Sequence, residues 1–262
     1  MGLLFVDSHC HLHDERVFPD MQQLVARARK AGVRTMVSCA TMEENFDRTA
    51  GLAASYGEIL PCFGIHPWFL DSLSCDWQQR LETFLTAHRS GIGETGLDFM
   101  DKKANRDLQI RVFSHHLKLA MDLERPINIH IRKAWDTFIH LLKKMGPLKT
   151  PGLIHSFSGS ADMIPLLEKY NLYISFSGSV TRPNAKKGVK ALGAVSRTRL
   201  ILETDTPDLY PSIPGVLENK RNEPKNLPAI AQIAAQRANM GYEEFVNHAY
   251  TNSLILFKTL LP

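Results

Sequence analysis

The chain has 262 residues, of which 44% are hydrophobic and 22% are charged, a composition typical of a globular protein large enough to bury a full core. Its formal charge of +4 permits an anionic partner without requiring one, and no stretch reaches the ~20 apolar residues of a membrane span. The cysteines show neither zinc-finger nor C-x-x-C spacing, and the N-terminus lacks a signal-peptide pattern, so we expect reduced thiols and a cytoplasmic location.

Short apolar runs alternate with longer amphipathic segments along the chain. The runs lie at residues 3–9, 34–40, 59–67, 91–99, 126–132, 152–158, 172–178 and 199–207. The amphipathic segments place apolar residues on one helical face, as with Met21, Leu24, Val25 and Ala28, or Leu108, Val112, Leu119 and Leu123. Eight strand–helix repeats in this length predict a TIM (β/α)₈ barrel, a single domain over residues 1–262. A doubly wound open sheet is the alternative.

The segment GIGETGLD at residues 91–98 fits the glycine spacing of a dinucleotide-binding loop. Such a loop needs a strand before its first glycine and a helix at its last. Here a helical pattern over residues 76–89 precedes the motif, and the next helical pattern begins only near Asn105. A glutamate would also oppose the charge of a pyrophosphate. We therefore interpret the segment as a strand that presents Glu94.

Polar side chains fall near the carboxyl ends of the predicted strands, where a barrel of this type carries its active site. His9 and His11 share a face of the first strand, because alternate strand residues point inward. On the fifth strand, Asn128, His130 and Arg132 lie opposite an isoleucine face. The side chains expected at one mouth of the barrel are His9, His11, Glu94, His130, His155 and Asp205.

Such a cluster of imidazoles and carboxylates predicts bound divalent cations, because buried unpaired charge costs several kcal/mol per group, roughly. Nitrogen and oxygen donors without thiolate suit Zn²⁺, Mn²⁺, Fe²⁺ or Co²⁺ better than Mg²⁺ or Ca²⁺, with Mg²⁺ kept as an alternative. Six ligands exceed the number that one zinc ion takes, which favours two cations bridged by a carboxylate.

The other histidines have simpler interpretations. Those on predicted helical segments are expected to be packing or surface residues: His88, His115, His116, His140 and His248. His13 follows the pair on the first strand and fits either a structural or a site role, so it is left out of the ligand set. Asp7 and Glu203 share strand parity with the ligands but lie deeper, where they could orient ligand imidazoles.

The motifs, taken together and in order, resemble the TatD family of metal-dependent hydrolases, a TIM-barrel branch of the amidohydrolase superfamily. The resemblance covers essentially the whole chain. It rests on DSHCHL at 7–12, GIHP at 64–67, GETGLD at 93–98, INIHIR at 127–132, HSFSGS at 155–160, ETDTP at 203–207 and RNEP at 221–224. Thr95 and Thr206 depart from the residues common in the family, which concerns substrate preference rather than metal binding.

The resemblance implies a division of the ligands between two metals. His9 and His11 would hold one metal with Asp205, and Glu94 would bridge to the second. The second metal would be held by the remaining two histidines of the mouth, His130 and His155.

The resemblance also implies phosphodiester hydrolysis, as a deoxyribonuclease that removes nucleotides from a 3′ end. Asp205 and Glu94 are then the catalytic residues, with Asp205 as the general base. Groups expected to bind substrate phosphates are His66, Arg132, Arg221 and Asn222. DNA is the expected partner, with no membrane and no obligate protein partner, and the protein is expected to be a monomer or weak oligomer.

Two other functions stay open. The same chemistry could hydrolyse carboxylic esters or amides, including the ester of an aminoacyl-tRNA, because an activated water attacks a carbonyl as readily as phosphorus. A barrel that binds metal or nucleic acid without turnover is the alternative from another class. The serine-glycine-serine turns at 158–160 and 177–179 could contact phosphate or simply cap helices.

Overall fold

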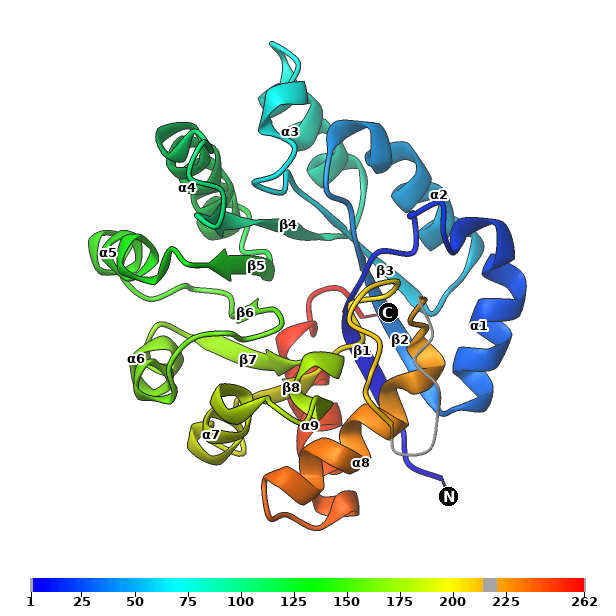
Figure 1. Cartoon of the computed structure of the whole chain (residues 1–262). Coiled ribbons are helices and arrows are strands. Elements are labelled where there is room, and N and C mark those ends of the chain that lie inside the picture. The colour runs from blue at the N-terminus through cyan, green and yellow to red at the C-terminus, as the bar shows by residue number, and fades with distance from the viewer. Residues whose placement is uncertain (1, 214–220, 262) are drawn as a thin grey trace.

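The computed structural model describes residues 2–213 and 221–261. Eight parallel strands are hydrogen-bonded in chain order, and the helices surround them (Figure 1). The strands are β1 (Phe5–Cys10), β2 (Val33–Cys39), β3 (Ile59–Phe63), β4 (Gly91–Asp98), β5 (Ile127–Arg132), β6 (Gly152–Ile154), β7 (Leu172–Phe176) and β8 (Leu200–Leu202). This order confirms the predicted TIM barrel and excludes a doubly wound open sheet, in which the strand order reverses.

The helices follow the strands as predicted. They are α1 (Met21–Lys30), α2 (Phe46–Ser55), α3 (Trp77–Ala87), α4 (Arg106–Asp122), α5 (Trp135–Met145), α6 (Ile164–Lys169), α7 (Lys186–Ala194), α8 (Leu227–Arg237) and α9 (Tyr242–Leu256). The four apolar residues expected on α1 are all buried. On α4 the expectation fails at Leu123, which is 41% exposed because the helix ends at Asp122. Within the described residues no helix is long and apolar enough to cross a membrane.

Hydrogen bonds between β1 and the segment after β8 join the two edges of the sheet. The Asp205 amide donates to the His9 carbonyl at 3.0 Å, and the His11 amide donates to the Thr206 carbonyl at 2.7 Å. Deeper in the barrel, Ser8 Oγ donates to the Leu202 carbonyl at 2.7 Å. Residues almost 200 positions apart in the sequence therefore share one edge of the site.

Asp7 takes part in this closure, and its predicted role in orienting an imidazole is wrong. Its carboxylate accepts from the Thr204 amide at 2.8 Å and from Thr204 Oγ1 at 2.5 Å. The pairing of β1 with β2 shifts register between Asp7 and Cys10, so strict alternation does not hold there. Burial raises the pKa of Asp7 to about 7, although the Thr204 hydrogen bonds oppose that shift.

The glycines of β4 allow close packing against β5. Gly93 and Gly96 have φ values of +133° and +154°, which L side chains rarely adopt. A Cβ atom at Gly93 would lie 2.6 Å from the Asn128 carbonyl oxygen, and one at Gly96 would lie 1.8 Å from the His130 carbonyl oxygen. The glycine spacing is thus explained by strand contact, which confirms the strand interpretation of residues 91–98.

The C-terminal part of the chain covers the end of the barrel opposite the mouth. Leu256, Phe257 and Leu260 form one apolar cluster with strand residues that include Val6 and Ile201. A second, larger apolar cluster fills the layer between strands and helices.

Candidate metal centre

The mouth of the barrel holds a cavity of about 580 Å³ whose floor carries titratable side chains. The six residues predicted as ligands converge there: His9, His11, Glu94, His130, His155 and Asp205. His9 is fully buried and Glu94 is 2% exposed, whereas Asp205 and His155 are each 8% exposed. Groups of three with ligand atoms close enough to share one ion occur among them.

Glu94 lies between two pairs of imidazoles. Its Oε2 atom is 3.5 Å from His9 Nε2 and 3.3 Å from His11 Nε2. Its Oε1 atom is 3.0 Å from both His130 Nδ1 and His155 Nε2. Each carboxylate oxygen therefore faces a different pair of nitrogens, which is the arrangement of a carboxylate that can bridge two cations.

Asp205 completes the group around His9 and His11. Its Oδ1 atom is 3.4 Å from the Nε2 atom of each histidine. Ligand atoms about 2.1 Å from a tetrahedral cation lie about 3.4 Å from one another, so these separations fit a bound ion. The backbone at Asp205 is left-handed, with φ of 58°, and such a conformation is uncommon outside glycine and typical of functional positions.

In each candidate histidine ligand, one ring nitrogen donates a hydrogen bond to an oxygen. This bond fixes the tautomer in which the other ring nitrogen can bind metal. The pairs are His9 Nδ1 with Asn128 Oδ1 at 2.8 Å, His11 Nδ1 with the Cys39 carbonyl at 2.9 Å, His155 Nδ1 with Glu203 Oε1 at 3.2 Å, and His130 Nε2 with Asp98 Oδ2 at 3.2 Å. The amide of Asn128 is oriented by its own bond from Nδ2 to the Ser8 carbonyl.

The expected role of Glu203 therefore agrees with its contacts, since the same oxygen also accepts from the Ser156 amide at 2.7 Å. The partners of the other three histidine ligands were not predicted from the sequence. Asn128 could have been found, because it shares a strand face with His130. The partner of His11 carries no sequence signal, because it is a backbone carbonyl, whereas Asp98 shares strand parity with Glu94 and ends the GETGLD motif.

His66 differs from the candidate ligands, because its proton lies on the ring nitrogen that faces the cavity. Its Nδ1 atom accepts from the Trp68 amide at 3.2 Å, so a neutral ring carries its proton on Nε2. Burial lowers the pKa of His66 to about 3, which keeps the ring neutral. Nε2 lies 3.5 Å from Glu94 Oε1 at the cavity. His66 therefore presents an N–H donor to the cavity, which suits contact with an anionic oxygen better than metal ligation.

Of the other three residues predicted to bind substrate, one lines the cavity and two make contacts outside its lining. Arg132 is exposed and lines the cavity, as does Arg182, which sequence analysis did not single out. Arg221 donates to the Arg16 carbonyl and to Glu223 outside the cavity lining. Asn222 is fully buried and donates to the Thr204 carbonyl at 2.8 Å, so it holds the loop after β8.

Several minor expectations also have an outcome. Ser160 and Ser177 accept hydrogen bonds from the second residue after them, as N-caps of short 3₁₀ helices. Thr206 Oγ1 hydrogen-bonds Thr204 Oγ1 at 2.7 Å, and Thr95 is fully buried. His116 is a packing residue, because it is fully buried and bonds to the backbone at both ring nitrogens.

In the metal-free protein, histidines of the ligand cluster have raised pKa values. Burial opposes protonation of His11, but hydrogen bonds to Asp205 and Glu94 outweigh it and raise the pKa to about 9. Burial and the charge of His9 oppose protonation of His155, yet Glu94 and Glu203 raise its pKa to about 10. At neutral pH both rings therefore carry protons that a metal must displace.

We expect metal binding to release at least two protons per protein near neutral pH, because ligand imidazoles must be neutral. Burial opposes protonation of His9 as well, but Glu94 and Asp205 raise its pKa well above the usual value, so its proton adds to those of His11 and His155. Since the raised pKa values belong to the metal-free form, the apparent affinity should increase as pH rises from 7 toward about 9 and level off above about 10. Titration calorimetry of Zn²⁺ or Mn²⁺ binding in buffers of different ionisation enthalpy measures the released protons. A pH-independent affinity with no proton release would contradict these ligands.

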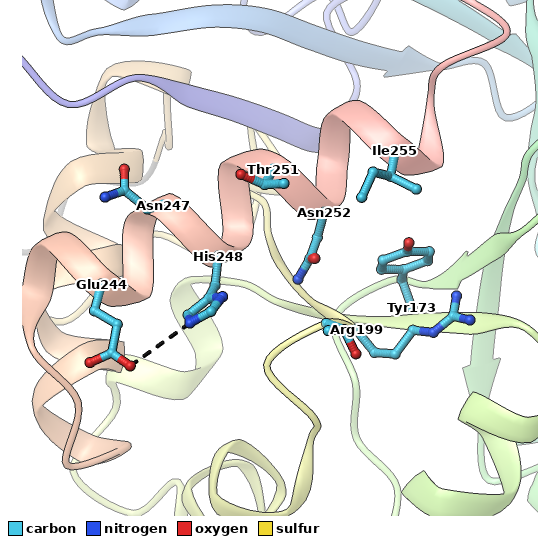
Figure 2. Close-up of a pocket in the computed structure, with 9 residues that line it drawn as sticks. Tyr173, Arg199, Glu244, Asn247, His248, Thr251, Asn252 and Ile255 are labelled. Atoms are coloured by element: carbon cyan, nitrogen blue, oxygen red, sulfur yellow. Dashed lines mark ion pairs between the residues drawn. The ribbon is translucent and has the colours of Figure 1, made fainter.

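A second cavity, of about 590 Å³, lies between α9 and residues near the starts of β7 and β8 (Figure 2). It contains one histidine–carboxylate pair, His248 with Glu244 at 3.8 Å, and Arg199 lies over the ring of Tyr173. Neither the side chains drawn there nor the lining residues form a converging set of ligands. The chemistry of the described residues is therefore concentrated at the other end of the barrel.

Comparisons with known proteins show the family to which the chain belongs. The model of the family described as TatD related DNase matches residues 6–258. The chain belongs to the TatD family. A TatD-family relation is also seen with YabD of Bacillus subtilis, named an uncharacterized metal-dependent hydrolase, which is 31% identical over 97% of this chain and 99% of its own length.

Two further TatD relatives align along nearly their whole length. The deoxyribonuclease TATDN3 of Homo sapiens is 30% identical over 99% of this chain and 96% of its own length. The crystal structure of the TatD homologue YJJV from Escherichia coli superposes with a TM-score of 0.91 at 27% identity, covering 97% of this chain and 98% of that one. The match confirms the family resemblance drawn from the motifs.

Proposed function

We propose that this protein is a divalent-metal-dependent phosphodiesterase that removes nucleotides from the 3′ end of DNA. The observation that carries the proposal is Glu94, whose two oxygens face separate pairs of histidine nitrogens on the floor of a cavity. It is supported by the names of relatives, a metal-dependent hydrolase in Bacillus subtilis and a deoxyribonuclease in Homo sapiens. The 3′ polarity rests on the family resemblance alone.

Two divalent cations at this site would supply positive charge to the phosphate oxygens and acidify the attacking water. The first would be held by His9, His11 and Asp205, and the second by His130 and His155, with Glu94 shared. The ring partners described above keep these imidazoles in the ligating tautomer.

Asp205 would accept the proton of the attacking water. Burial opposes its ionisation, but hydrogen bonds to His11 and His9 hold its pKa well below the usual range, so the side chain is ionised at neutral pH, which is the form that a general base needs. His66 would donate from Nε2 to a phosphate oxygen, and Arg132 at the rim would bind a phosphate with its guanidinium.

The depth of the site supports action on a strand end. Five of the six candidate ligands line the cavity, whereas His9 is fully buried, and Glu94 is only 2% exposed. A phosphate inside a stacked duplex cannot descend to that floor, whereas the unpaired terminal nucleotide of a strand can. We therefore propose single-stranded ends as the preferred form of the substrate.

The test is a nuclease assay on purified protein with matched elemental analysis. Protein stripped with a chelator should release no nucleotides from single-stranded DNA, and Zn²⁺, Mn²⁺, Co²⁺ or Mg²⁺ should restore release with up to two ions bound. An ester and amide panel run beside bis-nitrophenyl phosphate serves as the comparison. Faster turnover of the carbonyl compounds, or no DNA hydrolysis with any metal, would reject the nuclease.

A further inference from the structure

Trp68 is the most exposed large apolar side chain of the described residues, at 62% exposure, and it lines the cavity above the ligand cluster. Leaving an indole in water forgoes the favourable burial of a large apolar side chain. A single exposed aromatic residue on a general surface needs no explanation, but this one stands at the mouth of the candidate site.

The ring of Trp68 is held in place. Its Nε1–H donates to Asp98 Oδ2 at 2.8 Å, and Asp98 is 2% exposed. The same oxygen accepts from His130 Nε2 at 3.2 Å, so one buried carboxylate anchors both the indole and a candidate metal ligand. The indole also packs edge-on to the His66 ring, with centroids 4.9 Å apart. The indole therefore has a fixed position relative to the ligand cluster.

The other large aromatic side chains at the cavity are less available. Phe157 is 5% exposed and packs against Trp135, with ring centroids 5.2 Å apart. Phe69 is half-buried and lies beside His66, with ring centroids 6.0 Å apart. Among the described residues of the lining, Trp68 is thus the aromatic group that offers a large open surface.

We propose that Trp68 is a stacking platform for the nucleobase next to the phosphate that is cleaved, and that it makes the site selective for nucleotides over other phosphodiesters. This inference rests on the proposed nuclease function and extends it to the recognition of the base. A flat indole stacks on every base, because each base has a π-face, so the platform favours nucleic acid without reading its sequence. It also requires an unpaired base, in agreement with action on single-stranded ends.

The test compares Trp68→Leu with Trp68→Phe on single-stranded oligodeoxynucleotides. Both variants lose the hydrogen bond to Asp98, but only phenylalanine keeps a ring, so their difference isolates stacking. Trp68→Leu should raise KM for an ordinary oligonucleotide about 10-fold to 100-fold with kcat little changed, and Trp68→Phe should stay within about 5-fold of wild type. Trp135→Phe, on α5, is the matched control and should leave both constants unchanged.

The second substrate is an oligonucleotide whose 3′-terminal residue lacks its base. Wild type and Trp68→Leu are compared on both substrates, so that the effects of removing the indole and of removing the base can be separated. On this substrate wild type and Trp68→Leu should have the same KM, because the platform has nothing to stack on. Equal KM values for the two proteins on the ordinary oligonucleotide would overturn the inference. The inference would also be overturned if Trp68→Leu raised KM as much on the abasic oligonucleotide as on the ordinary one.

Failure of the proposed function is separable from failure of this inference. If wild-type protein hydrolyses no DNA, the nuclease proposal falls and the platform is tested by binding. The ordinary oligonucleotide should then quench tryptophan emission in wild type and leave the emission of Trp68→Phe unchanged, since the other tryptophans lie outside the cavity lining. Equal quenching in both proteins, or none in either, would reject the platform.

Discussion

Asp205→Asn is expected to lower kcat for DNA hydrolysis by about 10³-fold. The substitution keeps the size of the side chain but removes the charge that lies 3.4 Å from both His9 and His11, and with it the acceptor for the water proton. Single-turnover assays at saturating metal measure the chemical step. Elemental analysis shows whether one ion is also lost.

Asp208→Asn is the matched control for that measurement. Asp208 lines the same cavity three residues along, but its side chain is 54% exposed and pairs with Arg16 at 2.8 Å. An exposed ion pair of this kind contributes ~0–1 kcal/mol to stability, so its loss should leave the fold intact. Because Asp208 lies outside the ligand cluster, activity should stay within about 5-fold of wild type. Should Asp205→Asn be as active as Asp208→Asn with equal metal content, the proposed base is wrong.

Gly96→Ala is expected to destabilise the fold by about 4 kcal/mol or more, or to prevent folding. The added Cβ would lie 1.8 Å from the His130 carbonyl oxygen, and that atom belongs to the backbone of β5 rather than to a flexible side chain. The φ of +154° adds strain of its own. Urea denaturation followed by circular dichroism measures the change.

Gly51→Ala, within α2, is the control for adding the same methyl group. A Cβ atom at Gly51 meets no atom within 4 Å, and alanine is the better helix former by about 1 kcal/mol. This variant should therefore be slightly more stable than wild type. A Gly96→Ala protein that is as stable as Gly51→Ala would refute the close contact between β4 and β5.

The barrel and its ligand cluster could be predicted because two regularities are visible in sequence. The strand–helix repeat sets the topology, and alternation along a strand sets the inward face, as for Asn128 and His130 on β5. Asp7 departs from this regularity, because a register shift in β1 breaks alternation there and the carboxylate accepts hydrogen bonds from Thr204 instead. Local irregularity of this kind depends on the neighbouring strand and has no signal in the strand itself.

Loop residues were harder to place than strand residues. Arg221 and Asn222 follow β8 in the sequence, but their hydrogen bonds hold the loop itself, so their predicted contacts with phosphate do not enter the proposal. Trp68 could not be predicted as a site residue, because a single tryptophan after a strand has no periodicity. Its position over the cavity follows from the path of the β3–α3 segment in three dimensions.

The apolar plug formed by Leu256, Phe257 and Leu260 has a consequence for biosynthesis. These side chains complete the inner layer that begins with Val6, so the two ends of the chain must meet before the inner layer of the barrel is dry. A ribosome-bound chain that stops short of residue 256 would keep that layer open to water. We therefore expect this inner layer to be shielded from water only after residues 256–260 have been synthesised and packed against the strands.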